Sequence, residues 1–181
     1  MVTIDTSRLV LRRWREGDVP AMAAVNADPE VMRWIRDGRV LTPEETRRWI
    51  ERIEKVWDTE GFGLFAVELR ATGELVGFTG LAVPSFLPEV LPAVEIGWRL
   101  GRPFWGRGIA TEAATAVLRF GFEGRDLERI ISIAQVGNSA SERVMAKLGL
   151  RPERETTVPG NGRVVRVHEL TRVAYLARRQ A

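Results

Sequence analysis

The segment RPFWGRGIATEAA at residues 102–114 places Gly106 and Gly108 one residue apart, directly before an apolar, alanine-rich run. Strand-like segments flank it, AVEIGWRL at 93–100 and RIISIAQ at 129–135. Glycine adopts backbone conformations closed to other residues and lets another group approach the main chain. The succession of strand, glycine turn, helix and strand therefore predicts a β-α-β unit whose helix begins at an open stretch of backbone.

The N-terminal half predicts helices whose first residues are marked by capping signals. Asp18 precedes a short helix that we expect it to cap, and a second short helix follows Pro29. Thr42-Pro43-Glu44-Glu45 is a capping box for a helix to about Thr59. Its apolar stripe is expected to contain Trp49, Ile53, Val56 and Trp57. The strands expected in this half are 8–14, 63–70 and 74–83, the last two joined by a hairpin turn at 71–73.

The C-terminal half predicts two helices and further strands. The helix after the glycines runs to about Phe122, and a second helix covers 139–148 and ends at Gly149. Two strands, about 150–157 and 163–176, surround a Pro-Gly-Asn-Gly turn. The order β-α-α-α-β-β-β-α-β-α-β-β predicts one mixed α/β domain over 1–181, an antiparallel meander followed by the β-α-β unit.

Composition excludes several classes of function. Hydrophobic residues make up 45% of the chain and charged residues 28%, which is typical of a globular protein. The absence of cysteine excludes disulfides, thiolate zinc sites and a catalytic thiol, and a single histidine, His168, gives no basis for a multi-histidine metal site. We therefore expect no metal. No signal peptide or membrane span is visible, so we expect a cytoplasmic protein that does not bind membranes.

The net charge of +3 is not concentrated in one basic patch. Arginine and glutamate alternate, as in EETRR at 44–48, which indicates a solvated helix face. A nucleic-acid binder usually gathers its positive charge on one surface. We therefore expect no nucleic-acid partner.

Three phosphate-binding interpretations of the glycines compete with a plain turn. A P-loop needs GxxxxGK[ST], which is absent. A dinucleotide fingerprint fails because Thr111 stands at the third glycine position and the next strand ends without a carboxylate. The third interpretation is an anion nest, in which backbone N–H groups of 106–111 grip a pyrophosphate and Arg107 reaches a phosphate. A strand-to-helix turn that merely needs two glycines is the alternative.

A second segment, NSASERVMAKLGL at 138–150, stands at the start of the next helix. Asn138 and the serines that follow it are ordinary helix-capping residues. Asn138 also follows the strand next to the glycine turn, so it is a candidate ligand as well as a cap.

In this order and spacing, VEIGWRL, WGRGIATEA, IISIAQV and NSASERVMAKLGL resemble the GNAT superfamily of N-acetyltransferases. The opening TSRLVLRRWREGD and the tail RVVRVHELTRVAYL are similar to its RimJ/RimL-type branch, which acetylates N-terminal amines of ribosomal proteins. The resemblance covers nearly the whole chain. It implies a GNAT-type single α/β domain, with a central, mostly antiparallel sheet flanked by helices and splayed between the strands at 93–100 and 129–135.

The resemblance implies acetyl-CoA as the cosubstrate. The pyrophosphate loop Q/R-x-x-G-x-G/A of the family maps to 105–110, with Trp105 where the general pattern has Gln or Arg and where this branch often has an aromatic residue. The strands splay to admit the pantetheine arm, which Asn138 would hydrogen-bond. The residues implied to bind the cosubstrate are Ile96, Gly97, Trp98, Trp105, Gly106, Arg107, Gly108, Ile109, Ala110, Thr111 and Asn138.

The family transfers acetyl directly from the thioester to an amine, which agrees with the absence of cysteine. Glu95 interrupts an apolar strand and is the candidate base, with a solvent-facing or arginine-paired carboxylate as the alternative. Ser141 occupies the N-x-x-S position and is the candidate hydrogen-bond donor to the leaving thiolate, with an inert first-turn serine as the alternative. Glu112 is interpreted as structural. Tyr175, expected near the end of the last strand, does not match the family's usual tyrosine.

The acceptor is an amine, either a protein N-terminus or a small molecule. The loop at 84–92 and the helix at 42–59 are expected to shape its groove, and His168 is interpreted as structural or as lining this pocket. The alternative function is a non-catalytic acyl-CoA-binding sensor of the same fold. A homodimer at the open edge of the last strands is an expectation that rests on the branch alone.

Overall fold

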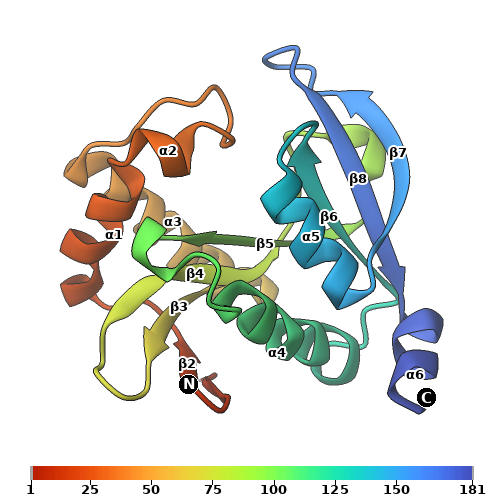
Figure 1. Cartoon of the computed structure of the whole chain (residues 1–181), viewed down its shortest axis with the longest axis horizontal. Helices are drawn as coiled ribbons and strands as arrows, with labels where there is room; N and C mark the ends of the chain where they lie inside the picture. The colour runs from red at the N-terminus through yellow and green to blue at the C-terminus, as the bar shows by residue number, and fades with distance from the viewer. Residues whose placement is uncertain (1, 181) are drawn as a thin grey trace. The chain divides into compact units, whose positions relative to one another are not determined.

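A computed structural model describes residues 2–180 of the chain (Figure 1). They form two compact units, one of residues 2–80 and 98–116 and one of residues 81–97 and 117–180. The strand order is β1-β2-β3-β4-β5 in the first unit and β5-β6-β8-β7 in the second, so strand β5 (Val94–Leu100) contributes to both. The described residues thus contain eight strands, mostly antiparallel and flanked by helices, which confirms the α/β class.

The first unit is an antiparallel meander with helices. Its strands are β1 (Ile4–Asp5), β2 (Leu9–Arg12), β3 (Leu64–Leu69) and β4 (Leu75–Ala82). Its helices are the short 3-10 helix η1 (Glu16–Asp18), α1 (Val19–Asn26), α2 (Pro29–Met32) and α3 (Pro43–Glu60). The sequence did not predict strand β1 or the 3-10 helix η1, because segments of two or three residues show no periodicity.

Helix α3 begins and ends as its sequence predicts. The side chain of Thr42 accepts from the backbone N–H of Glu45, whose carboxylate accepts from the N–H of Thr42, and Gly61 ends the helix in the left-handed conformation. Ile53 and Trp57 are buried. Val56 is 37% exposed, so its assignment to the buried stripe was wrong. Residue 56 lies one position before Trp57, about 100° around the helix, and falls outside the face that packs.

The side chain of Asp18 does not cap α1, which corrects the prediction. Both its oxygens instead accept from the guanidinium of Arg12, at 2.8 and 2.9 Å, and one also accepts from the N–H of Arg15. Arg12 additionally pairs with Glu68 at 2.8 Å. Arg12 and Asp18 are each only 6% exposed. Two carboxylates raise the pKa of Arg12 against the opposing effect of burial, so this arginine is a satisfied buried cation.

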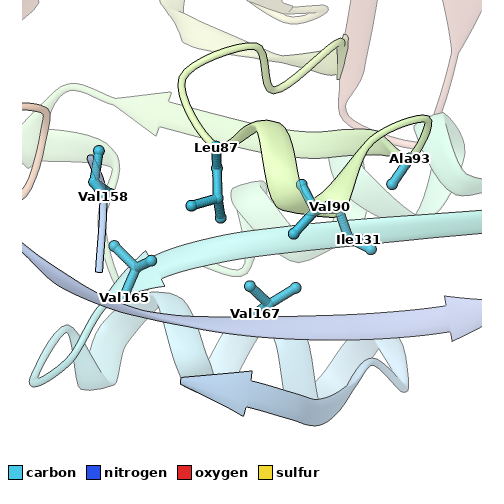
Figure 2. Close-up of a cluster of buried hydrophobic side chains, with 7 residues drawn as sticks. All are labelled: Leu87, Val90, Ala93, Ile131, Val158, Val165 and Val167. Carbon is cyan, nitrogen blue, oxygen red and sulfur yellow. The ribbon is translucent and has the colours of Figure 1, made fainter. Parts of the chain in front are cut away.

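The second unit joins the N-terminal part of β5 to β6 (Arg129–Gln135), β8 (Val164–Thr171) and β7 (Arg151–Thr157). The loop before β5 contains the 3-10 helix η2 (Pro88–Val90). Figure 2 shows Leu87 and Val90 pointing from this segment toward β6 and β8. The buried cluster drawn there consists of Leu87, Val90, Ala93, Ile131, Val158, Val165 and Val167. The proline-rich loop is therefore anchored by apolar packing.

The predicted β-α-β unit is present. Strand β5 leads through the 3-10 helix η3 (Arg102–Phe104) to helix α4 (Ile109–Gly124) and then to β6, which is parallel to β5. The ladder between them contains two pairs, Val94 with Ile130 and Glu95 with Ile131. Beyond that point β6 pairs with β8 alone, up to Gln135. The predicted splay thus begins after Glu95.

The chain after β8 is helical, which corrects the predicted strand to residue 176. Helix α6 covers Arg172–Gln180, and Tyr175 lies on it. The ring of Tyr175 stacks on Phe122 at 4.7 Å and its hydroxyl donates to Glu123 at 2.7 Å. Arg179, one helical turn after Tyr175, also donates to Glu123, so these two residues attach α6 to α4. Helix α5 (Ser139–Leu148) ends at Gly149 as predicted.

Residues 2–180 contain neither a membrane-spanning helix nor a cluster of metal-binding side chains. No described helix is long and apolar enough to cross a membrane. The described residues also contain no group of three or more His, Cys, Asp or Glu side chains placed to hold a metal ion.

Replacing Asp18 by Ala is expected to lower the free energy of unfolding by about 3–5 kcal/mol, because it leaves the buried Arg12 with one carboxylate fewer. Urea unfolding followed by circular dichroism measures this loss. The matched control is Glu16→Ala in the same 3-10 helix, whose side chain is 73% exposed in its pair with Arg47. We expect a change of at most about 1 kcal/mol there. Equal losses in the two variants would contradict the role of the buried pair.

Candidate active site

The glycine turn in the first unit has the backbone geometry of an anion nest. Gly106 and Gly108 have φ angles of 71° and 75°, and α4 begins at the next residue, Ile109. A Cβ atom added to Gly106 would meet nothing within 4 Å, so the main chain faces open space there. Successive N–H groups in such a turn, at the positive end of a helix dipole, suit a phosphate.

The residues around the turn hold it in place. The indole nitrogen of Trp105 donates to the carbonyl of Leu100 at 2.8 Å, while the residue remains 47% exposed. Ile109 is 2% exposed and anchors the first turn of α4 in the core. Arg107 is exposed, with its guanidinium carbon 5.8 Å from the centroid of the Phe104 ring. The turn therefore exposes its backbone and one cation, Arg107, to solvent, while Trp105 and Ile109 hold it in place.

Glu112, in the first turn of α4, points away from the nest toward the turn between β1 and β2. Its carboxylate accepts from the hydroxyls of Thr6 and Ser7 at 2.7 and 3.0 Å, and from the backbone N–H and the Nε of Arg8 at 2.9 and 2.6 Å. Burial alone would raise the pKa of Glu112, but these bonds lower it to about 2. This matches the structural interpretation of the residue.

Arg8 is a residue of this region that the sequence did not single out. Besides pairing with Glu112, its Nη1 donates to the carbonyl of Arg107 at 3.0 Å. Its Nη2 lies 3.5 Å from where a Cβ of Gly108 would stand. Arg8 therefore fixes the peptide between the two glycines. The opening motif TSRL contains Arg8, but nothing local shows that it meets a turn about a hundred residues later.

Glu95, in the second unit, is the carboxyl group at the splay. Burial of this group raises the pKa of Glu95 to about 8, although its carboxylate accepts a hydrogen bond from the backbone N–H of Ile133. The residue as a whole is half-buried. Neither alternative for Glu95 fits: the carboxyl group is desolvated, and it forms no ion pair within residues 2–180.

Asn138 and Ser141 stand at the start of α5. The side-chain oxygen of Asn138 accepts from the backbone N–H of Ser141 at 3.3 Å, which makes Asn138 the N-cap. The amide nitrogen of Asn138 and the hydroxyl of Ser141 have no hydrogen-bond partner among residues 2–180, and both residues are half-buried. The capping interpretation is thus correct, and two donors remain for another group.

The other predicted residues are divided between the units. In the second unit Ile96 is fully buried and Gly97 is half-buried, with nothing within 4 Å of where its Cβ would stand. In the first unit Trp98, Ala110 and Thr111 are half-buried. Gly97 therefore has open space where a side chain would otherwise stand.

His168 is a buried residue of β8, opposite Ser132 of β6 and 4% exposed. Burial lowers the pKa of His168 below its ordinary value, so the imidazole is neutral at pH 7. Its Nδ1 is buried without a hydrogen-bond partner. These observations favour the structural interpretation of this residue.

Comparison with known proteins decides the family. The family described as "Acetyltransferase (GNAT) domain" matches residues 8–151. The chain belongs to the GNAT acetyltransferase family. It is 33% identical over 150 residues to the uncharacterized N-acetyltransferase YnaD of Bacillus subtilis, covering 83% of each chain. Its activity is therefore acetyl transfer to an amine.

Solved GNAT structures agree with this fold. A GNAT-family acetyltransferase from Bacillus anthracis has a TM-score of 0.80 and 28% identity, covering 95% of this chain and 99% of its own. The ribosomal L7/L12 alpha-N-protein acetyltransferase RimL, solved with coenzyme A, has a TM-score of 0.78 and 19% identity, covering 96% and 99%. At that identity RimL shows the fold alone.

The bonds to Glu112 predict how this GNAT chain responds to acid. Because the folded pKa of Glu112 lies below its unfolded value, its contribution is complete above about pH 5 and is lost as the pH falls toward 2. Urea unfolding at several pH values measures it. We expect wild type to lose more stability than Glu112→Gln between pH 5 and pH 3. Parallel curves for the two proteins would show that the carboxylate contributes nothing.

Proposed function

We propose that this protein is an acetyl-CoA-dependent N-acetyltransferase that binds the pyrophosphate of its cosubstrate on the backbone of residues 106–111. The supporting observation is the pair of positive φ angles at Gly106 and Gly108, directly before a helix of 16 residues. A helix N-terminus carries roughly half a positive charge. The nest therefore attracts a phosphate without a metal ion, and Arg107 adds a full charge beside it.

The pantetheine arm is proposed to run along the part of β5 that has left the ladder with β6. Backbone groups of Ile96 and Trp98 are proposed to hydrogen-bond the arm, and Gly97 between them leaves room for it because it has no side chain. The free amide nitrogen of Asn138 is a further donor for a carbonyl of the arm. One single domain over 1–181 is part of this proposal, since the family match extends through both compact units.

Glu95 is the proposed general base. A base works best when its pKa lies near the operating pH, and the pKa of Glu95 is raised to about 8 by burial. A peptide α-amine has a pKa of about 7.7–8.0, close to that value, whereas a lysine side chain has about 10.4. Glu95 is therefore matched to an α-amine or another weakly basic amine, better than to lysine.

The reaction proposed is a direct transfer. The free amine attacks the thioester carbonyl carbon, the C–N bond forms, and the C–S bond breaks with its electron pair leaving on sulfur. The proton lost by the amine nitrogen goes to the carboxylate of Glu95. The thiolate of coenzyme A accepts a hydrogen bond from the Ser141 hydroxyl, which has no partner in the described chain, and takes its proton from solvent.

The acceptor is proposed to be a peptide N-terminus or a small amine. A non-catalytic sensor, the alternative, would bind the same cosubstrate without turnover. A homodimer stays a prediction. The edge strand β7 is rich in charge, with Arg151, Glu153, Arg154 and Glu155, and such strands resist edge-to-edge pairing.

Gly106→Glu is expected to weaken binding of acetyl-CoA by about tenfold or more, because a carboxylate would occupy the proposed phosphate site. Isothermal titration with acetyl-CoA measures the dissociation constant. The matched control is Gly73→Glu, at a hairpin turn with φ of 72° and nothing within 4 Å of the added Cβ. It introduces the same strain and charge, and we expect wild-type affinity. Equal affinity in both variants would mean that the glycine turn holds no phosphate.

The rate of acetyl transfer at low substrate concentration is expected to rise with pH and level off above about pH 8, since Glu95 must lose its proton to act as a base. Glu95→Gln is expected to lower kcat/KM by about a hundredfold and to remove this inflection. A weakly basic acceptor amine with a pKa below about 6 separates the two titrations, because its own ionisation is complete before that of Glu95. An unchanged pH profile in the variant would assign the inflection to another group.

A further inference from the structure

We propose that the acceptor carries a carboxylate beside its amine, and that the guanidinium of Arg99 on β5 binds it. This inference rests on the proposed function and adds a substrate class to it. Arg99 is a half-buried cation without a counter-ion. No ion pair involves it within residues 2–180, where its single side-chain hydrogen bond runs from Nη1 to Asn26 Oδ1, at 2.6 Å.

The rest of the guanidinium is unsatisfied. The Nε of Arg99 is buried and has no hydrogen-bond partner. Nη2 makes no hydrogen bond either, and it is not among the buried atoms, so it keeps access to solvent. A guanidinium offers five N–H donors in a planar fork that matches a carboxylate. Arg99 therefore presents the N–H groups of Nη2 to an incoming anion, while Nε stays buried beside it.

Its surroundings hold Arg99 in one orientation. The guanidinium carbon lies 5.6 Å from the ring centroid of Trp49 and 5.2 Å from that of Phe78. Asn26, which accepts from Arg99, is fully buried and donates in turn to the hydroxyl of Thr46 at 3.1 Å. A cation fixed in this way loses little side-chain entropy when it binds a ligand.

The charge of Arg99 persists at neutral pH. Burial and, to a smaller extent, the neighbouring charge of Arg36 together lower the pKa of Arg99 to about 10. A pKa near 10 still leaves the group protonated at pH 7. An unpaired buried charge is costly, so its presence calls for a ligand or another function.

Two other arginines, the buried Arg12 and the half-buried Arg13, are paired with carboxylates. Arg12 is paired with Asp18 and Glu68. Arg13, which also lies against an indole ring, is paired with Glu54 and Asp58. The charges of both these arginines are thus neutralised by carboxylates. Arg99, in contrast, donates to the neutral side-chain amide of Asn26 and not to a carboxylate.

The location of Arg99 favours the acceptor over the cosubstrate. Arg99 and Glu95 are four residues apart on β5, and alternation along a strand puts both on the same side. Trp49, which covers Arg99, belongs to α3, the helix that the family resemblance assigns to the acceptor groove. The phosphates of coenzyme A are proposed to bind at the glycine nest, so they do not need Arg99.

The decisive experiment compares acceptors with and without a carboxylate: the C-terminally amidated dipeptides Ser-Asp and Ser-Asn, and β-alanine with β-alaninamide, with kcat/KM corrected for the fraction of unprotonated amine. For the pair that is turned over, we expect wild-type kcat/KM to favour the carboxylate by about thirtyfold. The preference should fall to near one in Arg99→Gln and Arg99→Met and be partly kept in Arg99→Lys. The free amino acid and the dipeptide distinguish a small-molecule acceptor from a peptide.

Three controls keep the outcomes separate. Arg70→Gln removes an exposed arginine that pairs with Asp5 and should retain the wild-type preference. The dissociation constant of acetyl-CoA should be the same in wild type and Arg99→Gln. If it rises in the variant, and dephospho-coenzyme A abolishes the difference, Arg99 binds the 3′-phosphate and the proposal is wrong. Unfolding temperatures of the ligand-free Arg99→Met variant should equal or exceed wild type, because an unpaired buried charge has been removed.

If the protein acetylates none of these amines, a binding measurement still tests the inference about Arg99. Succinate should raise the unfolding temperature of wild type more than succinamide does, and this difference should vanish in Arg99→Gln. Absence of turnover together with this carboxylate-specific shift would overturn the proposed function while supporting the anion site. Turnover without a charge preference, or no succinate-specific shift in an inactive enzyme, would overturn the inference about Arg99.

Discussion

Where β5 stops pairing with β6, the backbone N–H of Ile133 needs an acceptor, and the carboxyl group of Glu95 provides it. A buried N–H without a partner would cost about 1–3 kcal/mol. The side chain of Glu95 therefore takes the place of a main-chain acceptor and lets the two strands separate without that loss. The same contact fixes the carboxyl group at the splay in a desolvated position. Burial in this position raises the pKa of the candidate base, although the hydrogen bond from Ile133 acts in the opposite direction.

The glycine turn is kept free of competing negative charge. A carboxylate in the first turn of a helix lies close to any phosphate bound at that helix N-terminus and would repel it. Glu112 occupies such a position, but it is turned toward Thr6 and paired with Arg8. Arg8 also holds the carbonyl of Arg107, which orients the peptide between the glycines. The backbone N–H groups are thereby left as the exposed polar surface.

Local signals predicted most elements, because each depends on residues close together in the chain. The capping box at Thr42, the glycine that ends α5 and the apolar strand β6 all lie where the sequence placed them. The prediction of a strand up to residue 176 was wrong, because the segment RVAYL has the apolar pattern of a strand when its contacts in the fold are not known. In the fold, Tyr175 and Arg179 lie four residues apart on a helix and both contact Glu123. That long-range contact overrides the strand-like pattern.

The features that govern binding and chemistry were less accessible to the sequence, since they join distant residues. Glu95 was a candidate by its position in an apolar strand, but its desolvation is a property of the fold. Asn26 and Arg99 are 73 residues apart, and each is unremarkable in its own segment. An aspartate at position 26 could also accept from Arg99, but it would cancel the charge and could not donate to Thr46. The amide makes both hydrogen bonds and remains neutral. It orients the guanidinium and leaves its positive charge available to a ligand.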